Sequence, residues 1–340
     1  MKRIIILAGF LLLVCAAVAM GQNGRFSGYM FGDLYYVASN HKSNLEGRNG
    51  FWFRRIYFTY DKALTGGFSM QFRLEMASPG NFTSNSKLVP FVKDAYLKWS
   101  KGRHQLILGI SSTPTWEIIE KVWGYRSVEK TPLDLQKWGS SRDFGLAAKG
   151  DLNESGSFKY HVMFANGAGN KGETNKGKKF LGSIGFYPNR SFLIEVYGDY
   201  ESLPADKTVS TYQFFAAFKT DKIRLGVQYA HQTRTNATVG GNDLELNQVS
   251  AFLAANLSAK TNIFARVDRL MDPNPKGAGI SYLPFDSTAK ALFCVAGFDL
   301  LPSNDIHFIP NVEAVFYGKN EAGVKPGSDL IPRVTFYYKF

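Results

Sequence analysis

The chain has 340 residues, of which 45% are hydrophobic, 15% aromatic and 20% charged. This composition excludes a disordered chain, which would be poor in apolar residues, and a collagen-like chain, which would show a glycine period. The net charge of +12 suggests an anionic partner such as nucleic acid or a phosphate-bearing surface, and the positions of the charges must decide whether it has one.

The first 21 residues are predicted to be a secretory signal peptide. A basic start at Lys2 and Arg3 precedes an apolar run over residues 4–20, and small residues lead to a cleavage site near Gly21. One alternative is an uncleaved membrane anchor, for which the run is close to the minimum length. The other is a lipoprotein attached through Cys15, which the bulky side chain before the thiol disfavours.

The mature chain, residues 22–340, keeps a net charge of +10 after the loss of Lys2 and Arg3. Cys294 is its only cysteine, so neither a disulfide within the chain nor a cysteine metal site is expected. No later segment approaches 18 consecutive apolar residues, so no helical membrane span is predicted. The remaining destinations for an exported chain are the periplasm, the exterior, or the outer membrane as a closed barrel.

Alternation of apolar and polar residues predicts β-strands along the mature chain. In residues 68–76 every even position is apolar and every odd position is polar, and the pattern returns in 158–164, 223–229, 248–257 and 333–340. A period of two gives a strand one apolar and one polar face. A soluble β-sandwich alternates in the same way, so this pattern alone does not choose between a sandwich and a barrel.

The connections between the predicted strands alternate in length. Eight long ones cover residues 37–49, 77–88, 111–141, 167–178, 201–208, 231–245, 272–289 and 318–328. Seven short turns lie between them, near residues 62–67, 100–103, 152–156, 189–191, 219–222, 258–260 and 301–305. A sandwich has no reason to sort its connections by length, whereas an outer-membrane barrel does. The expected fold class is therefore all-β, a sixteen-stranded antiparallel transmembrane β-barrel.

Several motifs of the mature chain together resemble one known family. They are FWFRRIYFTY at 51–60, the turn at 63–67 with the strand 68–75, KDAYL at 93–97, Gly109 with Pro114, SRDFG at 141–145, and the C-terminal Phe340 with apolar residues at alternate positions before it. They resemble the phosphate-selective porin O and P family over most of the mature chain. The resemblance implies a sixteen-stranded porin, usually trimeric, with a preference for anions. Related porin-like families without phosphate selectivity are the alternative.

The connection 111–141 is far longer than its neighbours and is expected to be an in-folded third loop. Thr115 is predicted to cap a short helix through Val122. The apolar side of this helix would consist of Trp116, Ile119 and Trp123. Packing this side against the inner wall would cover it and constrict the channel. The alternative is a loop that lies over the barrel mouth or in a trimer contact.

The polar phase of the strands predicts which charged side chains line the interior. The inward bases would be Arg55, Arg73, Lys98, Lys149, Lys159, Arg224, Arg266, Arg333 and Lys339, and the inward acids Asp33, Glu75, Asp94, Asp143, Glu195, Asp199, Asp268 and Glu313. The wall is then nearly neutral, so pairs between neighbouring strands are expected rather than a ring of one sign. The residues expected to line the pore or its constriction are Arg55, Arg73, Lys98, Lys149, Arg224, Arg266, Trp116, Trp123 and Arg126.

These patterns, together with what the family resemblance implies, predict an outer-membrane porin, a water-filled channel for passive diffusion with a mild preference for anions such as phosphate. The expected partners are small anions, other hydrophilic solutes and outer-membrane lipids, and the expected assembly is a homotrimer. Most of the positive charge falls in loops, where it fits either the steering of anionic solutes or contact with phosphates of the outer leaflet.

Other function classes find less support in the sequence. The five histidines lack metal-ligand spacing and there is no Gly-x-Ser-x-Gly motif, so no catalytic residue, metal or cofactor is expected. Nucleic-acid binding is disfavoured because the basic residues are scattered over the loops. The alternative function is a barrel without a channel that acts as an adhesin, a structural protein or an enzyme at its rim.

Overall fold

The computed structural model describes residues 24–340 except 84 and 239. The predicted signal peptide, residues 1–21, lies outside the described residues. Sixteen strands account for most of the described part of the chain: β1 Gly24–Tyr36, β2 Asn49–Ala63, β3 Phe68–Ala77, β4 Val89–Lys101, β5 His104–Ser112, β6 Arg142–Asp151, β7 Phe158–Ala165, β8 Lys179–Phe186, β9 Phe192–Leu203, β10 Lys207–Lys219, β11 Ile223–Arg234, β12 Leu244–Ser258, β13 Thr261–Leu270, β14 Ala291–Ser303, β15 Ile306–Tyr317 and β16 Asp329–Lys339.

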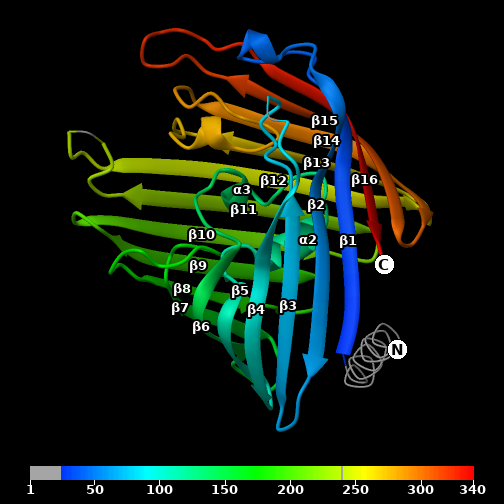
Figure 1. The fold of residues 1–340 in the computed structure, drawn as a ribbon, viewed down its shortest axis with the longest axis vertical. Helices are drawn as coiled ribbons and strands as arrows, with labels where there is room; N and C mark the ends of the chain where they lie inside the picture. The colour runs from blue at the N-terminus through cyan, green and yellow to red at the C-terminus, as the bar shows by residue number, and fades with distance from the viewer. Residues whose placement is uncertain (1–23, 84, 239) are drawn as a thin grey trace, which may run out of the picture.

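The strands form one closed antiparallel barrel (Figure 1). Each strand pairs with its neighbours in the chain, and β1 closes the barrel by pairing with β16 from Tyr29 opposite Lys339 to Tyr35 opposite Arg333. Closure leaves no unpaired sheet edge, which is the usual solution for a large all-β chain. The predicted sixteen-stranded antiparallel barrel is confirmed.

Within residues 24–340, except 84 and 239, helical structure is confined to connections. The helices are α2 Glu117–Trp123 and α3 Pro132–Leu135, with 3-10 turns η1 Ser43–Leu45 and η2 Gly277–Gly279. In the described part of the chain, none of the helices has the length and apolar character needed to cross a membrane.

The connections alternate in length as predicted, with one exception. Residues 201–208 were expected to form a long loop, but β9 runs to Leu203, β10 begins at Lys207, and these two residues pair directly. Ala205 and Asp206 both have positive φ, the backbone state that a tight hairpin turn requires. The prediction was wrong because the two strands continue to pair through polar residues, where the apolar alternation has already ended.

The two faces of the barrel wall differ sharply in composition. In β9 the side chains of Phe192, Ile194 and Val196 are exposed on the outer face, and the alternate residues Leu193 and Glu195 are buried on the inner face. Large exposed apolar side chains recur in the same phase around the barrel. The exterior is therefore an apolar belt, and the polar and charged residues of the strands point inward.

Two β-bulges change the inward phase. The register of β1 and β2 shifts between Phe31 and Gly32, which leaves Arg54 as an extra residue beside Arg55. A second shift, between β3 and β4, leaves Lys93 as an extra residue beside Asp94. A bulge sets two consecutive residues against one on the partner strand. Both arginines and the Lys93–Asp94 pair consequently bring charged groups to the inner face.

Candidate functional site

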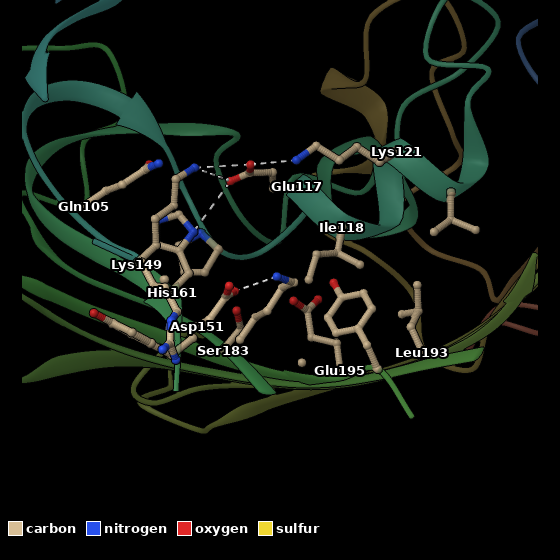
Figure 2. A pocket seen from close by; sticks show the side chains of 18 of the residues that line it. Gln105, Glu117, Ile118, Lys121, Lys149, Asp151, His161, Ser183, Leu193 and Glu195 are labelled. Carbon is tan, nitrogen blue, oxygen red and sulfur yellow. Dashed lines mark hydrogen bonds and ion pairs between the residues drawn. The ribbon is translucent and has the colours of Figure 1, made fainter. Parts of the chain in front are cut away.

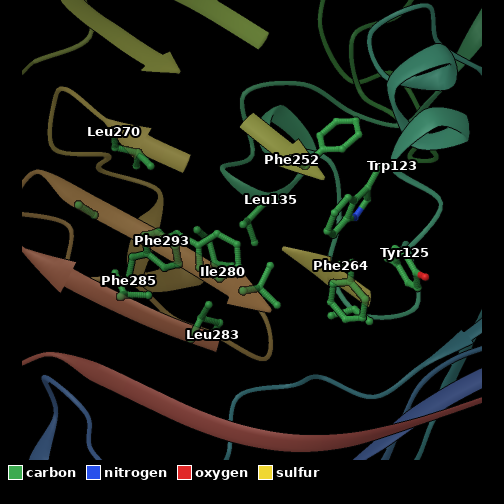
Figure 3. Close-up of a cluster of buried hydrophobic side chains, with 14 of the residues drawn as sticks. Trp123, Tyr125, Leu135, Phe252, Phe264, Leu270, Ile280, Leu283, Phe285 and Phe293 are labelled. Carbon is green, nitrogen blue, oxygen red and sulfur yellow. The ribbon is translucent and has the colours of Figure 1, made fainter. Parts of the chain in front are cut away.

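The connection between β5 and β6, residues 113–141 and here called the long loop, packs against inward-facing side chains of the wall. Its helix α2 contacts β10, β11 and β12. The ring centroid of Trp123 lies 5.3 Å from that of Phe252 and 5.9 Å from that of Phe264. Figure 3 shows these rings in one buried apolar cluster with side chains of the connection 271–290. Trp123, predicted to lie on the apolar side of the helix, is almost completely buried.

Amide side chains hydrogen-bond to backbone carbonyls of the long loop. Gln213 donates to the carbonyl of Thr115 at 3.2 Å, and Gln232 donates to that of Trp138 at 2.7 Å. Asn274, in the connection 271–290, donates to the carbonyl of Gln136 at 2.8 Å. These donors satisfy carbonyls that have no partner within a regular element, so they fix the path of the loop.

The predicted helix cap is wrong. The helix α2 begins at Glu117, with Trp116 at the capping position and no side-chain cap. The Thr115 hydroxyl instead donates to the hydroxyl of Tyr197 on β9 at 2.9 Å. A buried partner on the wall competes successfully with a local cap, because it also links the start of the helix to the barrel.

Buried arginines of the wall bind the middle of the long loop. Arg266 donates to the carbonyl of Lys130, and Arg54 donates to that of Val128. Arg266 is also paired with Asp268 at 2.5 Å. The side chain of Arg266 is 0% exposed. This residue, expected to line the pore, therefore faces inward, but its side chain contacts the long loop and is not exposed to solvent.

A second group of charges lies on β2, β3, β4 and β6, where Arg55, Arg73 and Lys93 are partly exposed and Glu75, Asp94 and Arg142 are buried. Glu75 is shared by Arg55 at 2.5 Å and by Lys93 at 3.0 Å. Asp94 is shared by Arg73 at 3.3 Å and by Arg142. Each carboxylate thus pairs with two cations, and the expected pairing across neighbouring strands is confirmed for Arg55 and Arg73. We call these residues, Arg55, Arg73, Glu75, Lys93, Asp94 and Arg142, the shared-carboxylate cluster.

The long loop brings two further charges toward this cluster. Glu120 and Arg126 pair at 3.5 Å, and about a quarter to a fifth of each side chain is exposed. Arg126 interacts electrostatically with Glu75, and Glu120 with Arg142. Burial raises the pKa of Glu120 to about 7, and the neighbouring Arg126 offsets only part of that rise.

The remaining residues expected to line the pore lie at other places on the inner face. Lys149 pairs with Glu117 of α2 at 3.2 Å. The guanidinium of Arg224 lies 5.5 Å from the ring of Tyr125 in the long loop. Lys98 lines a separate small cavity, near the turn between β2 and β3.

Trp116, near the start of the long loop, links it to the loop's last residue, Ser141. Its indole N–H donates to the carbonyl of Ser141 at 2.7 Å, and the guanidinium of Arg142 lies 4.8 Å from its ring. Of the nine predicted residues, Arg55, Arg73 and Arg126 therefore lie in or beside the shared-carboxylate cluster. Trp116, Trp123 and Arg266 fasten the loop instead.

The sequence reasoning missed several charged residues of the inner face, and three of them lie at this site. Arg54 and Lys93 sit at bulges, so a strict period of two assigns them to the outside. Arg142 begins β6 in the outward phase, but its side chain reaches Asp94. The adjacent bases Arg54 and Arg55 were a usable signal, because two consecutive arginines in a strand are compatible with an apolar exterior only if both turn inward.

A metal centre is not apparent at this site. Among residues 24–340 without 84 and 239, no group of three or more His, Cys, Asp or Glu side chains is placed to hold a metal ion.

Comparison with known proteins shows the fold. No family model matches the sequence, and no curated protein matches it. The structure is similar to an anion-selective porin from Comamonas acidovorans, with a TM-score of 0.68 and 14% identity over 93% of this chain and 99% of that one. It is also similar to OmpF of Salmonella typhi, solved with daunomycin (TM-score 0.65, 12% identity, 94% and 98% covered), and to the outer-membrane channel DcaP of Acinetobacter baumannii (0.65, 13%, 93% and 97%).

Proposed function

We propose that this protein is an outer-membrane porin that lets small hydrophilic solutes diffuse passively through a water-filled channel. The observation that carries the proposal is a closed sixteen-stranded barrel whose exterior is apolar and whose interior is charged. An apolar exterior is stable in lipid, and sixteen strands enclose an interior wide enough for water. The porins and the channel with similar folds support the same function.

The long loop supplies the constriction in this proposal. Its aromatic side chains pack on the inner wall, and wall amides and arginines bind its carbonyls on several sides. These contacts support a loop that lies within the barrel over one that covers the mouth. Solutes then pass beside Glu120 and Arg126 and along the shared-carboxylate cluster.

A mild preference for anions follows from the charges at this place. Ion pairs join five cations, Arg55, Arg73, Lys93, Arg126 and Arg142, to three carboxylates, Glu75, Asp94 and Glu120. Asp134 interacts with Arg126 without a direct ion pair and reduces the excess from two charges to one. An excess this small favours anions such as phosphate without a dedicated binding ring.

The proposal includes a cleaved signal peptide, location in the bacterial outer membrane and a homotrimeric assembly. The family resemblance of the sequence supports the trimer, and cross-linking of the protein in intact membranes tests it.

Planar lipid bilayers test the channel. The purified protein is expected to produce stepwise conductance. In a salt gradient, the sign of the reversal potential is expected to show that anions pass more readily than cations. A silent bilayer would overturn the channel and favour an adhesin, a structural barrel or a rim enzyme. A reversal potential of the opposite sign would overturn the anion preference alone.

A further inference from the structure

A cavity of about 690 Å3 lies between helix α2 and the inner faces of β5 to β10. Figure 2 shows Glu117 and Lys121 on the helix facing Glu195 and Leu193 on the wall, with Ile118 between them. The volume falls within the range of small-molecule sites. This cavity lies apart from the shared-carboxylate cluster, and none of the six residues of that cluster lines it.

One side of the cavity carries a carboxylate without a partner. Glu195 is 1% exposed, and neither of its oxygens has a partner at hydrogen-bonding geometry. The Ser183 hydroxyl on the neighbouring strand is close enough to act as a hydrogen-bond donor to it. Lys159, which also lines the cavity, pairs with Asp151 at 2.5 Å. A buried carboxylate costs free energy unless a cation or hydrogen-bond donors compensate it.

The opposite side of the cavity has more positive than negative groups. Glu117 pairs with Lys121 at 2.9 Å and with Lys149 at 3.2 Å, and His161 lies 3.7 Å away. Burial would raise the pKa of Glu117, but Lys149 and Lys121 outweigh it and lower the pKa to about 2. Glu117 is therefore charged at neutral pH, and two ammonium groups still share it. One positive charge on this side is left without a full counter-charge.

The wall next to Glu195 carries a glycine in place of a side chain. Gly185 lies directly between Lys159 and Glu195 in the sheet register, so about 10 Å of wall separates these two residues with no side chain between them. A Cβ atom at Gly185 would lie 3.0 Å from the ring of Tyr187 and 3.5 Å from the side chain of Ile118. Ile118 and Leu193 give the cavity an apolar lining.

We propose that this cavity binds a short zwitterionic peptide inside the channel. The peptide ammonium binds the Glu195 carboxylate, the peptide carboxylate binds the Lys121 and Lys149 ammonium groups, and an apolar side chain packs on Ile118 and Leu193. Each end of such a ligand corrects one charge imbalance, and both ends are needed. The inference rests on the proposed channel function and names a class of solute for it.

The test uses the dipeptide leucylglycine with the full protein in planar bilayers. Leucylglycine is expected to reduce the potassium chloride current, and N-acetyl-leucylglycine and leucylglycinamide, which each lack one charged end, are expected to be weaker blockers. Glu195→Gln should raise the half-blocking concentration at least about tenfold, as the loss of a charged hydrogen bond does. Asp299→Asn is the matched control, because Asp299 lines the cavity on the other side of α2, and it should leave the block unchanged.

The outcomes separate this inference from the proposed function. Conductance without any block by leucylglycine, or equal block by the acetylated peptide, would overturn the peptide site and leave the channel intact. If the protein is silent in bilayers, calorimetric titration of the detergent-solubilised protein with leucylglycine tests the peptide site. Binding of leucylglycine that Glu195→Gln removes supports the site although the channel fails, and the absence of binding overturns it. Mobility on unheated gels verifies that each variant is folded.

Discussion

Trp123→Ala is the substitution that most directly separates the fixing of the long loop from the folding of the barrel. The indole ring is 1% exposed, contacts Phe252 and Phe264, and donates to the Glu129 carbonyl at 3.0 Å. Burial of about 200 Å2 contributes about 5 kcal/mol at most, and truncation of a buried tryptophan costs about 3–5 kcal/mol. Arg266 keeps Asp268 as its partner, so no buried charge is left alone.

A loss of about 3–5 kcal/mol raises the ratio of released to packed loop about a hundredfold to several thousandfold, because 1.4 kcal/mol is tenfold. We expect Trp123→Ala to increase the noise of the open-channel current and to make the loop sensitive to trypsin at Lys121 and Lys137, which are exposed. Trp99→Ala is the matched control, since Trp99 lies on the outer face beside Phe68. A quiet, trypsin-resistant Trp123→Ala channel would refute the idea that this ring holds the loop.

Three further predictions concern the charges of the interior. Arg73→Gln combined with Lys93→Gln removes two cations of the shared-carboxylate cluster and leaves one cation for each carboxylate, Arg142 for Asp94 and Arg55 for Glu75. The reversal potential in a salt gradient should then indicate a lower preference for anions. An unchanged potential would contradict the proposed path of the solutes. Because the pKa of Glu120 is raised to about 7, lowering the pH from about one unit above to one unit below this value neutralises its carboxylate and should increase anion preference. Glu120→Gln should show the low-pH selectivity at both pH values, and a pH response that survives the substitution would refute this role. Arg54→Ala removes a partner of Asp33, Glu129 and Glu313 and should lower the free energy of unfolding in urea by about 3–5 kcal/mol. An unaltered urea transition would show that Arg333 alone compensates the buried carboxylates Asp33 and Glu313.

The strand pattern and the inward phase could be predicted because the environment on the two sides of the wall differs. An outer face in lipid, as proposed, must be apolar at every second residue, and this alternation runs through β3 and the first part of β9. The requirement ends where the strands leave the apolar belt. For that reason the extension of β9 and β10 to Leu203 and Lys207 was missed and the turn was interpreted as a loop.

The candidate site was predicted less completely, for two physical reasons. Bulges at Arg54 and Lys93 break the period of two, and only the adjacent bases Arg54 and Arg55 offered a local signal for one of them. The charges of the long loop sum to zero in the sequence, but the fold distributes them over the interior: Glu120 and Arg126 approach the shared-carboxylate cluster, and Glu117 pairs with Lys149 of the wall. The distribution of these charges depends on tertiary contacts that the spacing alone does not contain.

Osmotic swelling of proteoliposomes tests most directly whether solutes pass through a barrel interior narrowed by the long loop. We expect rapid swelling with a neutral monosaccharide and progressively slower swelling with a disaccharide, a trisaccharide and a tetrasaccharide, because the gap between the loop and the wall limits passage. Absence of swelling with every sugar, while the protein is folded in the vesicles, would contradict the channel. Equal rates for all four sugars would contradict the constriction.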